Sequence, residues 1–173
     1  IVESMREMSQ SSKEIKEETN IYATLTTSLT MAYNRSRQVS KIYLNGKLFD
    51  MDSINKNEYI YLCKVQKQRM EQVWIIVINN ALDELIKIDN YEDRILNINI
   101  FEDNNEIIIK FKDTAGGINK EIISDIFEPF ISSKLHSGMG VGLNIAKKIV
   151  DEQDGKIRAY NEDSGAVFEI RLQ

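Results

Sequence analysis

The N-terminal region, residues 1–38, has the hydrophobic spacing of a helix. It contains neither glycine nor proline, and apolar or small residues recur at intervals of three and four. A narrow stripe of this kind fits packing onto the chain's own domain and a two-chain coiled coil about equally well. The first stripe consists of Ile1, Met5, Met8, Ser12, Ile15 and Thr19, and a second follows at Tyr22, Leu25, Leu29 and Ala32.

The middle of the chain predicts short strands and then one long buried helix. Residues 41–49 form two β-prone runs around an Asn45-Gly46 turn, and residues 59–65 fit another strand. Residues 67–88 are predicted to be a helix, because apolar positions recur there at helical spacing. These positions are Met70, Val73, Trp74, Val77, Ile78, Ala81, Leu82 and Leu85.

The remaining strands come in pairs and do not alternate with helices. This order predicts an α+β fold: a two-layer α/β sandwich, with a mixed, largely antiparallel sheet packed on helices and an N-terminal helix before it. The helix over 141–153 is expected to end with Gly155 at its C-cap. The strand pairs are predicted at residues 95–101 with 107–111 and at 156–161 with 166–172, and a short helix at 119–127.

The charge and cysteine content of the chain restrict which ligands and which cellular compartments fit it. The formal net charge of -5 argues against a nucleic-acid partner. An anionic ligand would therefore need a local source of positive charge, such as a metal ion, a helix N-terminus or a well-placed Lys. A single cysteine, Cys63, excludes an internal disulfide framework and fits a reducing compartment. There is no apolar run long enough to span a bilayer and no signal peptide. A start at Ile1 in place of Met suggests an excised piece of a longer protein.

Glycine placement gives the first indication of a binding site. Five of the eight glycines form two clusters, Gly116-Gly117 and the series Gly138, Gly140 and Gly142. Glycine is costly inside regular structure, so such clusters mark special backbone geometry or close approach to a ligand. The second cluster runs into a predicted helix, whose first backbone N–H groups can hold phosphate. It is neither a P-loop nor a dinucleotide fingerprint, because the G-K-[ST] ending and the preceding strand are absent.

Four further features accompany the glycines in a fixed order. Asn80 lies near the end of the long helix, and its amide oxygen is a suitable ligand for Mg²⁺. Residues 113–118 follow a predicted strand and begin with Asp113, a carboxylate that only accepts hydrogen bonds when ionised. Residues 127–130, with the chain's single proline, and then Lys134 precede the glycine loop.

In this order the features resemble the ATP-binding domain of histidine kinases. Type II topoisomerases, the large heat-shock chaperones and mismatch-repair ATPases share the wider superfamily. Asn80 matches the N box, residues 113–118 the first glycine box, 127–130 the F box and 138–143 the second glycine box. The resemblance covers roughly residues 67–172 and implies ATP and Mg²⁺ as cofactors. It also implies two parts, a helical segment over 1–38 and an ATP-binding catalytic domain over 39–173.

The resemblance implies a role for each matched residue. Asn80 would bind the Mg²⁺ that bridges the phosphates, Asp113 would accept a hydrogen bond from the adenine amino group, and Lys134 would reach a phosphate. The alternatives are a surface amide on the helix, a turn former before glycine and an exposed loop lysine. The full implied ATP site comprises Asn80, Asp113, Gly117, Ile118, Lys134, Gly138, Gly140, Val141, Gly142 and Leu143.

Three positions depart from the family's pattern, of which Ala115, in place of a frequent Gly, is a mild change. In the branches that hydrolyse ATP, a Glu four residues before the N-box Asn activates water, but here that position is Ile76, which cannot act as a general base. This favours transfer to another nucleophile over hydrolysis. Val167 stands where the family often has Thr, so one polar contact beside the adenine is expected to be missing.

The single histidine, His136, falls in the loop expected to cover ATP, so an exposed loop residue is favoured over a phosphoacceptor. The family transfers the γ-phosphoryl group to a histidine on a dimerising helical hairpin, for relay to a response regulator receiver domain. We therefore predict that residues 1–19 are the second helix of that hairpin, that the parent protein is a cytoplasmic or membrane-anchored homodimer, and that this fragment does not autophosphorylate alone. A nucleotide-binding pseudokinase scaffold and a hydrolysing ATPase are the alternatives.

Overall fold

The protein folds into a sheet covered on one face by helices. The computed structural model describes residues 15–129 and 142–173. The strands are β1 (Glu17–Asn20), β2 (Lys41–Leu44), β3 (Lys47–Leu48), β4 (Leu62–Val65), β5 (Ile95–Asp103), β6 (Glu106–Asp113), β7 (Lys156–Glu162) and β8 (Gly165–Leu172). The helices are α2 (Ile21–Met31), α3 (Tyr33–Val39), α4 (Lys67–Leu85) and α5 (Gly142–Glu152), with short 3-10 turns η1 (Tyr91–Asp93) and η2 (Ile123–Asp125).

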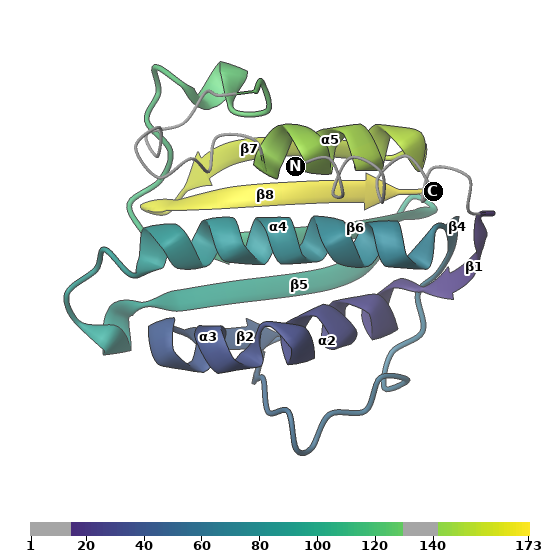
Figure 1. Ribbon diagram of the computed structural model, residues 1–173, viewed down its shortest axis with the longest axis horizontal. Helices are drawn as coiled ribbons and strands as arrows, with labels where there is room; N and C mark the ends of the chain where they lie inside the picture. The colour runs from purple at the N-terminus through teal and green to yellow at the C-terminus, as the bar shows by residue number, and fades with distance from the viewer. Residues whose placement is uncertain (1–14, 130–141) are drawn as a thin grey trace, which may run out of the picture.

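The main sheet has six strands in the order β3-β2-β5-β6-β8-β7, and the helices lie across one face of it (Figure 1). Strands β2 and β5 are parallel, and every other neighbouring pair in this sheet is antiparallel. Strand β8 lies between β6 and β7 although it follows both along the chain. The predicted two-layer α+β fold with a mixed, largely antiparallel sheet is confirmed.

Helix α4 fills the centre of the core. The side chain of Trp74 is completely buried and its ring lies 5.7 Å from that of Phe111 on β6. Its indole N–H donates a hydrogen bond of 2.8 Å to the hydroxyl of Thr24 on α2, so the one polar atom of the side chain is satisfied. Helices α2 and α4 are therefore locked together above the sheet.

The helix predicted from the spacing over residues 1–38 is wrong over Glu17–Asn20. These residues form β1, which pairs antiparallel with β4 in a separate two-stranded sheet. Asn20 ends the strand and caps α2: its Oδ1 accepts from the N–H groups of Tyr22 (3.2 Å) and Tyr61 (2.9 Å), and its Nδ2 donates to the carbonyl of Tyr59 (3.0 Å). The pairing with β4 and this cap outweigh the helical spacing, which offered only a diluted stripe here. Residues 1–14 lie outside the described residues.

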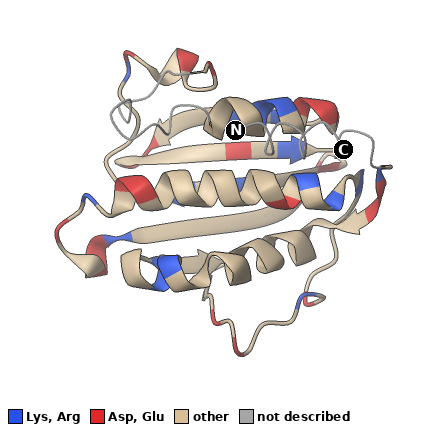
Figure 2. Cartoon of the chain, viewed as in Figure 1, with Lys and Arg blue, Asp and Glu red and all other residues tan. Residues whose placement is uncertain are grey.

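Helices α2 and α3 belong to the main core. Ile21, Leu25 and Leu29 are completely buried in the same cluster as the apolar residues of the sheet. Helix α2 carries no charged residue, in contrast to α4 and α5 (Figure 2). The second apolar stripe of the N-terminal region thus packs onto the chain's own domain, and the predicted division between residues 38 and 39 does not coincide with a break in the core.

Two smaller expectations also change. Within 119–127 the structure has only the 3-10 turn η2. At the end of α5 the left-handed residue is Asp154 (φ 58°), while the N–H of Gly155 donates to the carbonyl of Val150 (3.0 Å). Gly155 therefore lies one position beyond the expected cap. A Cβ there would come within 2.7 Å of the carbonyl oxygen of Arg171, so glycine serves close packing against β8.

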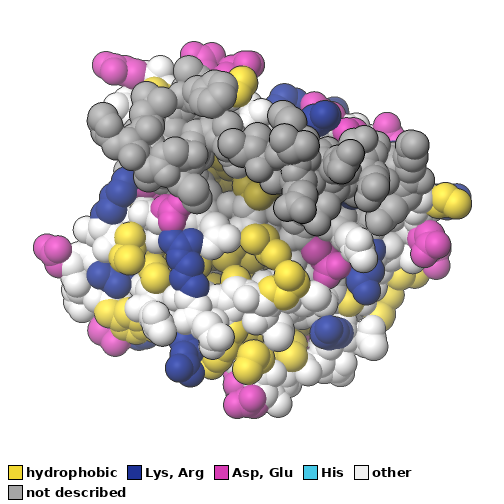
Figure 3. All heavy atoms as spheres, in the orientation of Figure 1, with side chains coloured by type: hydrophobic (Ala, Val, Ile, Leu, Met, Phe, Trp, Pro, Cys, Tyr) yellow, Lys and Arg dark blue, Asp and Glu magenta, His cyan; other side chains and the backbone are white. Residues whose placement is uncertain are grey.

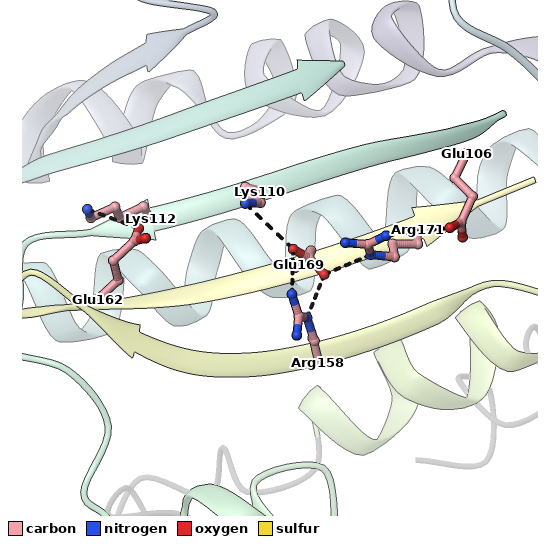
Figure 4. Close-up of polar contacts among 7 residues, drawn as sticks. All are labelled: Glu106, Lys110, Lys112, Arg158, Glu162, Glu169 and Arg171. Carbon is pink, nitrogen blue, oxygen red and sulfur yellow. Dashed lines mark hydrogen bonds and ion pairs between the residues drawn. The ribbon is translucent and has the colours of Figure 1, made fainter. Parts of the chain in front are cut away.

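The face of the sheet away from the helices carries a buried carboxylate. The side chain of Glu169 on β8 is 0% exposed, and its oxygens lie 2.6 Å from Nε of Arg158, 3.0 Å from Nε of Arg171 and 3.7 Å from Nζ of Lys110 (Figure 4). Burial by itself raises the pKa of Glu169, but the hydrogen bonds from the two guanidinium groups outweigh burial and lower this pKa to about 2. The carboxylate thus links β6, β7 and β8 through ion pairs with a cationic side chain of each strand.

The surface over the helix layer is mixed in character. In Figure 3, side chains of Lys and Arg are interspersed with those of Asp and Glu, and apolar side chains reach the surface between them. No helix in residues 15–129 and 142–173 is long and apolar enough to cross a membrane.

Candidate nucleotide-binding site

The predicted site residues that the structure describes lie on elements that begin or end at one end of the two layers. The C-terminal half of α4, the end of β6 and the starts of α5 and β8 all lie there (Figure 1). Asn80 is contributed by α4, Asp113 by β6 and Gly142 by α5. Lys134, His136, Gly138, Gly140 and Val141 lie outside the described residues.

Asp113 is held rigidly at the end of β6. Its residue is 4% exposed, and its Oδ1 accepts hydrogen bonds from the backbone N–H groups of Ala115 (2.9 Å) and Ala166 (3.2 Å). A carboxylate with two backbone donors on one oxygen is fixed in orientation. Such a group can accept a hydrogen bond from an amino group of a ligand.

The contact between Asp113 and β8 depends on Gly165. A Cβ at Gly165 would lie 1.9 Å from the carbonyl oxygen of Asp113, far inside any real contact distance. Glycine therefore lets β8 start directly against the end of β6, which brings the N–H of Ala166 to the carboxylate.

Gly117 and Ile118 are positioned by Asn161 on β7. The Oδ1 of Asn161 accepts from the N–H of Ile118 (2.7 Å), and its Nδ2 donates to the carbonyl of the same residue (2.8 Å). Gly117 has φ of +88°, and a Cβ on it would come within 2.9 Å of Oδ1 of Asn161. Only glycine combines this backbone conformation with so close an approach.

Asn161 was not among the predicted site residues. Its partners are backbone groups 43 positions away, and a contact with backbone leaves no residue-type pattern in the sequence. A weak signal does exist, because an Asn near the end of a predicted strand can serve as a hydrogen-bonding side chain.

Helix α4 presents Asn80 and Ile76 one helical turn apart. Both are partly exposed, and Cγ2 of Ile76 lies 3.4 Å from where a Cβ of Gly142 would be. Ile76 thus packs against the start of α5. The adjacent Asn79 accepts a hydrogen bond from Arg35 on α3, which also pairs with Asp83.

Mg²⁺ fits the chemistry of this site only together with a ligand. Among the described residues, no group of three or more His, Cys, Asp or Glu could hold a metal ion. The amide oxygen of Asn80 is one hard ligand, and Mg²⁺ commonly completes its shell with substrate phosphates and water.

The first residue of the F box is anchored to the sheet. The ring of Phe127 is edge-on to that of Phe168 on β8, with centroids 6.2 Å apart and an angle of 86° between the planes. Ile118 and Leu143 also pack against the core while staying partly exposed. Phe127 is therefore held in place beside the site by its contact with Phe168.

The expectation about Val167 stays a prediction, and the register of β8 shows on which face of the sheet this residue lies. Val167 pairs with Lys112, whereas Ala166 follows in register beside Asp113. Ala166 and Phe168 belong to the core under the helices and Val167 does not, because successive residues of a strand face opposite sides of the sheet. On β8 it is therefore the backbone N–H of Ala166 that reaches the carboxylate of Asp113.

Several sensor proteins are similar in sequence to this chain. The sensor protein KdpD of Clostridium acetobutylicum is 28% identical over 139 residues, which cover 77% of this chain and 14% of the relative. The C4-dicarboxylate transport sensor protein DctB of Rhizobium meliloti is 33% identical over 105 residues, 61% of this chain and 16% of the relative. The chain thus spans less than a fifth of the length of these relatives.

Solved structures share the fold. The catalytic domain of histidine kinase ThkA superposes with a TM-score of 0.73 at 22% identity, covering 92% of this chain and 95% of that one. The mycobacterial sensor histidine kinase MprB gives 0.70 at 16% identity, with 91% and 97% covered. The family model described as "Histidine kinase-, DNA gyrase B-, and HSP90-like ATPase" matches residues 66–173. The chain therefore belongs to the family of histidine kinase-, DNA gyrase B- and HSP90-like ATPases.

Proposed function

We propose that this chain is the ATP-binding catalytic domain of a two-component sensor histidine kinase. It transfers the γ-phosphoryl group of ATP to a histidine outside this fragment, for relay to the receiver domain of a response regulator. The observation that carries the proposal is Asp113, fixed by two backbone N–H groups beside the glycine turn, in a chain of this ATPase family. One solved neighbour, histidine kinase ThkA, is in complex with the response regulator protein TrrA.

In this proposal the ligand is divided between two groups of residues. Asp113 accepts a hydrogen bond from the adenine amino group, and Gly117 and Ile118 bring backbone against the base. Asn80 binds the Mg²⁺ that bridges the phosphates. The phosphates meet backbone N–H groups of the glycine loop (Gly138, Gly140 and Val141) and of the first residues of α5 (Gly142 and Leu143), with Lys134 as a mobile positive charge.

Phosphoryl transfer is favoured over ATP hydrolysis because Ile76 stands where the hydrolysing branches of the family carry a Glu as general base. Ile76 lies one turn before Asn80 on α4 and packs against the start of α5. An isoleucine side chain cannot take a proton from water. Phosphoryl transfer needs mainly positioning and charge neutralisation, which the remaining residues supply.

The phosphoacceptor and the dimer contact belong to the chain before β1. Since β1, α2 and α3 share the core of the ATP-binding domain, we restrict the proposed dimerisation helix to residues before Glu17. Homodimerisation through that helix and a cytoplasmic location of the domain are parts of the same proposal.

Calorimetric titration of Mg-ATP into the chain and into Asp113→Asn tests the proposal. Asn keeps the Oδ1 that accepts from Ala115 and Ala166, but it replaces the other acceptor oxygen by a donor. We expect at least about a tenfold loss of affinity, on the order of 1.4 kcal/mol. Asp103→Asn, at an exposed position of the β5–β6 hairpin, is the matched control.

Equal affinity of Asp113→Asn and the parent chain would remove the adenine contact from the proposal, and absence of binding by both would leave a scaffold as the function. Steady-state release of phosphate from ATP by the parent chain would instead indicate a hydrolysing ATPase.

A further inference from the structure

Arg35 links helix α3 to the C-terminal half of α4, which lies beside it (Figure 1). Its Nη1 donates a hydrogen bond to Oδ1 of Asn79 (2.5 Å), and its Nη2 pairs with Oδ1 of Asp83. Asn79 and Asp83 are four positions apart, so they lie on the same side of α4, one turn from each other. The planar guanidinium group spans this pair with two of its donors.

Helix α3 fixes the base of the Arg35 side chain. Ser36 and Val39 of this helix are buried. The hydroxyl of Tyr91 donates a hydrogen bond to the backbone carbonyl of Arg37 (2.8 Å), which ties the end of α3 to η1, the turn that follows α4. The positive charge of Arg35 is therefore held at one place over α4.

That place lies beside the residue proposed to bind Mg²⁺. Asn80 precedes Asp83 by three positions, a spacing that puts their Cβ atoms about 5–6 Å apart on the helix surface. The side chain of Asp83 is 21% exposed and that of Arg35 is 41% exposed, so water screens their charges only in part from a ligand at Asn80. The carboxylate of Asp83 repels phosphate groups bound there, and the guanidinium group of Arg35 offsets this repulsion.

We propose that Arg35 is a positioning residue for the phosphate end of the nucleotide. By offsetting the charge of Asp83, it lets the negatively charged Mg-ATP complex bind at Asn80. The inference rests on the proposed function, in which Asn80 binds the Mg²⁺ that bridges the phosphates. It adds a residue from α3 to a site otherwise made by α4, β6, β7, β8 and α5.

Binding of Mg-ATP, Mg-ADP and adenosine to the parent chain and to Arg35→Gln, measured by calorimetry, tests the inference. The substitution removes one positive charge and keeps a polar side chain. We expect Mg-ATP affinity to fall about tenfold, because the complex carries net negative charge. The loss for Mg-ADP should be smaller, since ADP lacks the γ-phosphate. Adenosine affinity should be unchanged, because adenosine has no phosphate.

A charge-balanced variant separates this role from a direct contact with phosphate. If Arg35 acts by offsetting Asp83, then Arg35→Gln combined with Asp83→Asn should bind Mg-ATP within about twofold of the parent chain. Arg35→Lys keeps the charge and should also keep most of the affinity. A double variant as weak as Arg35→Gln would mean that the guanidinium group itself binds the ligand, and it would overturn the inference.

Arg37→Gln is the matched control, because it removes the same charge from an exposed position two residues later on α3. Its guanidinium group lies over the ring of Tyr33, and we expect Mg-ATP affinity within about twofold of the parent chain. Ion pairs as exposed as that of Arg35 with Asp83 contribute little to stability, so the variants should fold.

Equal Mg-ATP affinity of Arg35→Gln and the parent chain would contradict the inference and leave the proposed function standing. An equal loss for all the ligands, adenosine included, would instead assign Arg35 to the packing of α3 on α4 and contradict the inference as well. Absence of binding of every ligand to the parent chain would overturn the inference together with the proposed function.

Discussion

At the residue scale, the loop after β6 is shaped by side chains that bind backbone. Asp113 accepts from Ala115 and Ala166, and Asn161 both accepts from and donates to Ile118. Each of these side chains replaces a hydrogen bond that regular secondary structure would have supplied. The base-binding end of the proposed site is thus shaped by contacts between side chains and backbone, most of them between positions far apart along the chain.

Substitution of Asn161 by Ala removes both contacts with Ile118 and leaves Gly117 free to move. With about 1 kcal/mol for each lost hydrogen bond, we expect Mg-ATP affinity to fall roughly 5- to 30-fold. Calorimetry measures this, with Asn99→Ala, at an exposed position of β5, as the control. Unchanged affinity would mean that the loop keeps its shape without Asn161.

Asp113 and Gly117 could be singled out from the sequence because they belong to an ordered set of motifs, and their contacts with ATP stay predictions. Asn161 could not, since its partners are backbone groups far away along the chain. The residues of the set beyond Phe127, including Lys134 and the glycines 138 and 140, stay predictions.

At the scale of elements, hydrophobic periodicity predicted those helices and strands that bury one continuous apolar face. Helix α4 and the hairpin β5–β6 appear as expected, because one apolar face repeats along each of them. Strand β1 was missed, because its identity depends on pairing with β4, more than forty positions away. The sequence did carry one usable signal. Asn20 before Ile21 and Tyr22 is a helix N-cap pattern, and it marks the residue at which α2 starts.

Two glycines in this part of the fold should respond differently to Ala. At Gly165 the new Cβ would meet the carbonyl oxygen of Asp113 at 1.9 Å, so β8 must shift, and we expect unfolding free energy to drop by at least about 3 kcal/mol. At Gly116 nothing lies within 4 Å, and only the left-handed backbone (φ +90°) opposes a side chain, which costs about 1–2 kcal/mol. Urea unfolding of both variants measures the difference, and equal losses would contradict it.

At the scale of the whole molecule, the two faces of the sheet are stabilised by different forces. The helix side buries an apolar core that includes Trp74 and Phe111, whereas the opposite side ties β6, β7 and β8 together through Glu169. The composition indicated the first of these. The second needed strand register, since Arg158 and Glu169 become neighbours only when β7 and β8 pair.

The Glu169 cluster makes stability depend on acid. The folded-state pKa of Glu169 is lowered from 4.5 to about 2, so its contribution is fully present above the unfolded pKa and is lost as pH falls from about 4.5 towards 2. Glu169→Gln should lower unfolding free energy by on the order of 2–3 kcal/mol at pH 7, because it strands partly exposed cations. This deficit should shrink as the pH approaches 2.

Urea unfolding across that pH range measures the deficit, and a difference independent of pH would assign it to packing. Glu162→Gln, which removes a carboxylate 3.2 Å from Lys112 at the surface, is the control and should change unfolding free energy by less than about 0.5 kcal/mol.

The place of β8 in the sheet also governs how the protein is made. It is synthesised after β6 and β7, yet it fills the position between them and supplies the Ala166 N–H that fixes Asp113. While the ribosome has not released it, one edge of β6 is unpaired, and such an edge can associate with other nascent chains. In the proposed function, a domain without β8 in place lacks the Ala166 N–H that orients Asp113, so we expect it to bind ATP more weakly than the completed domain.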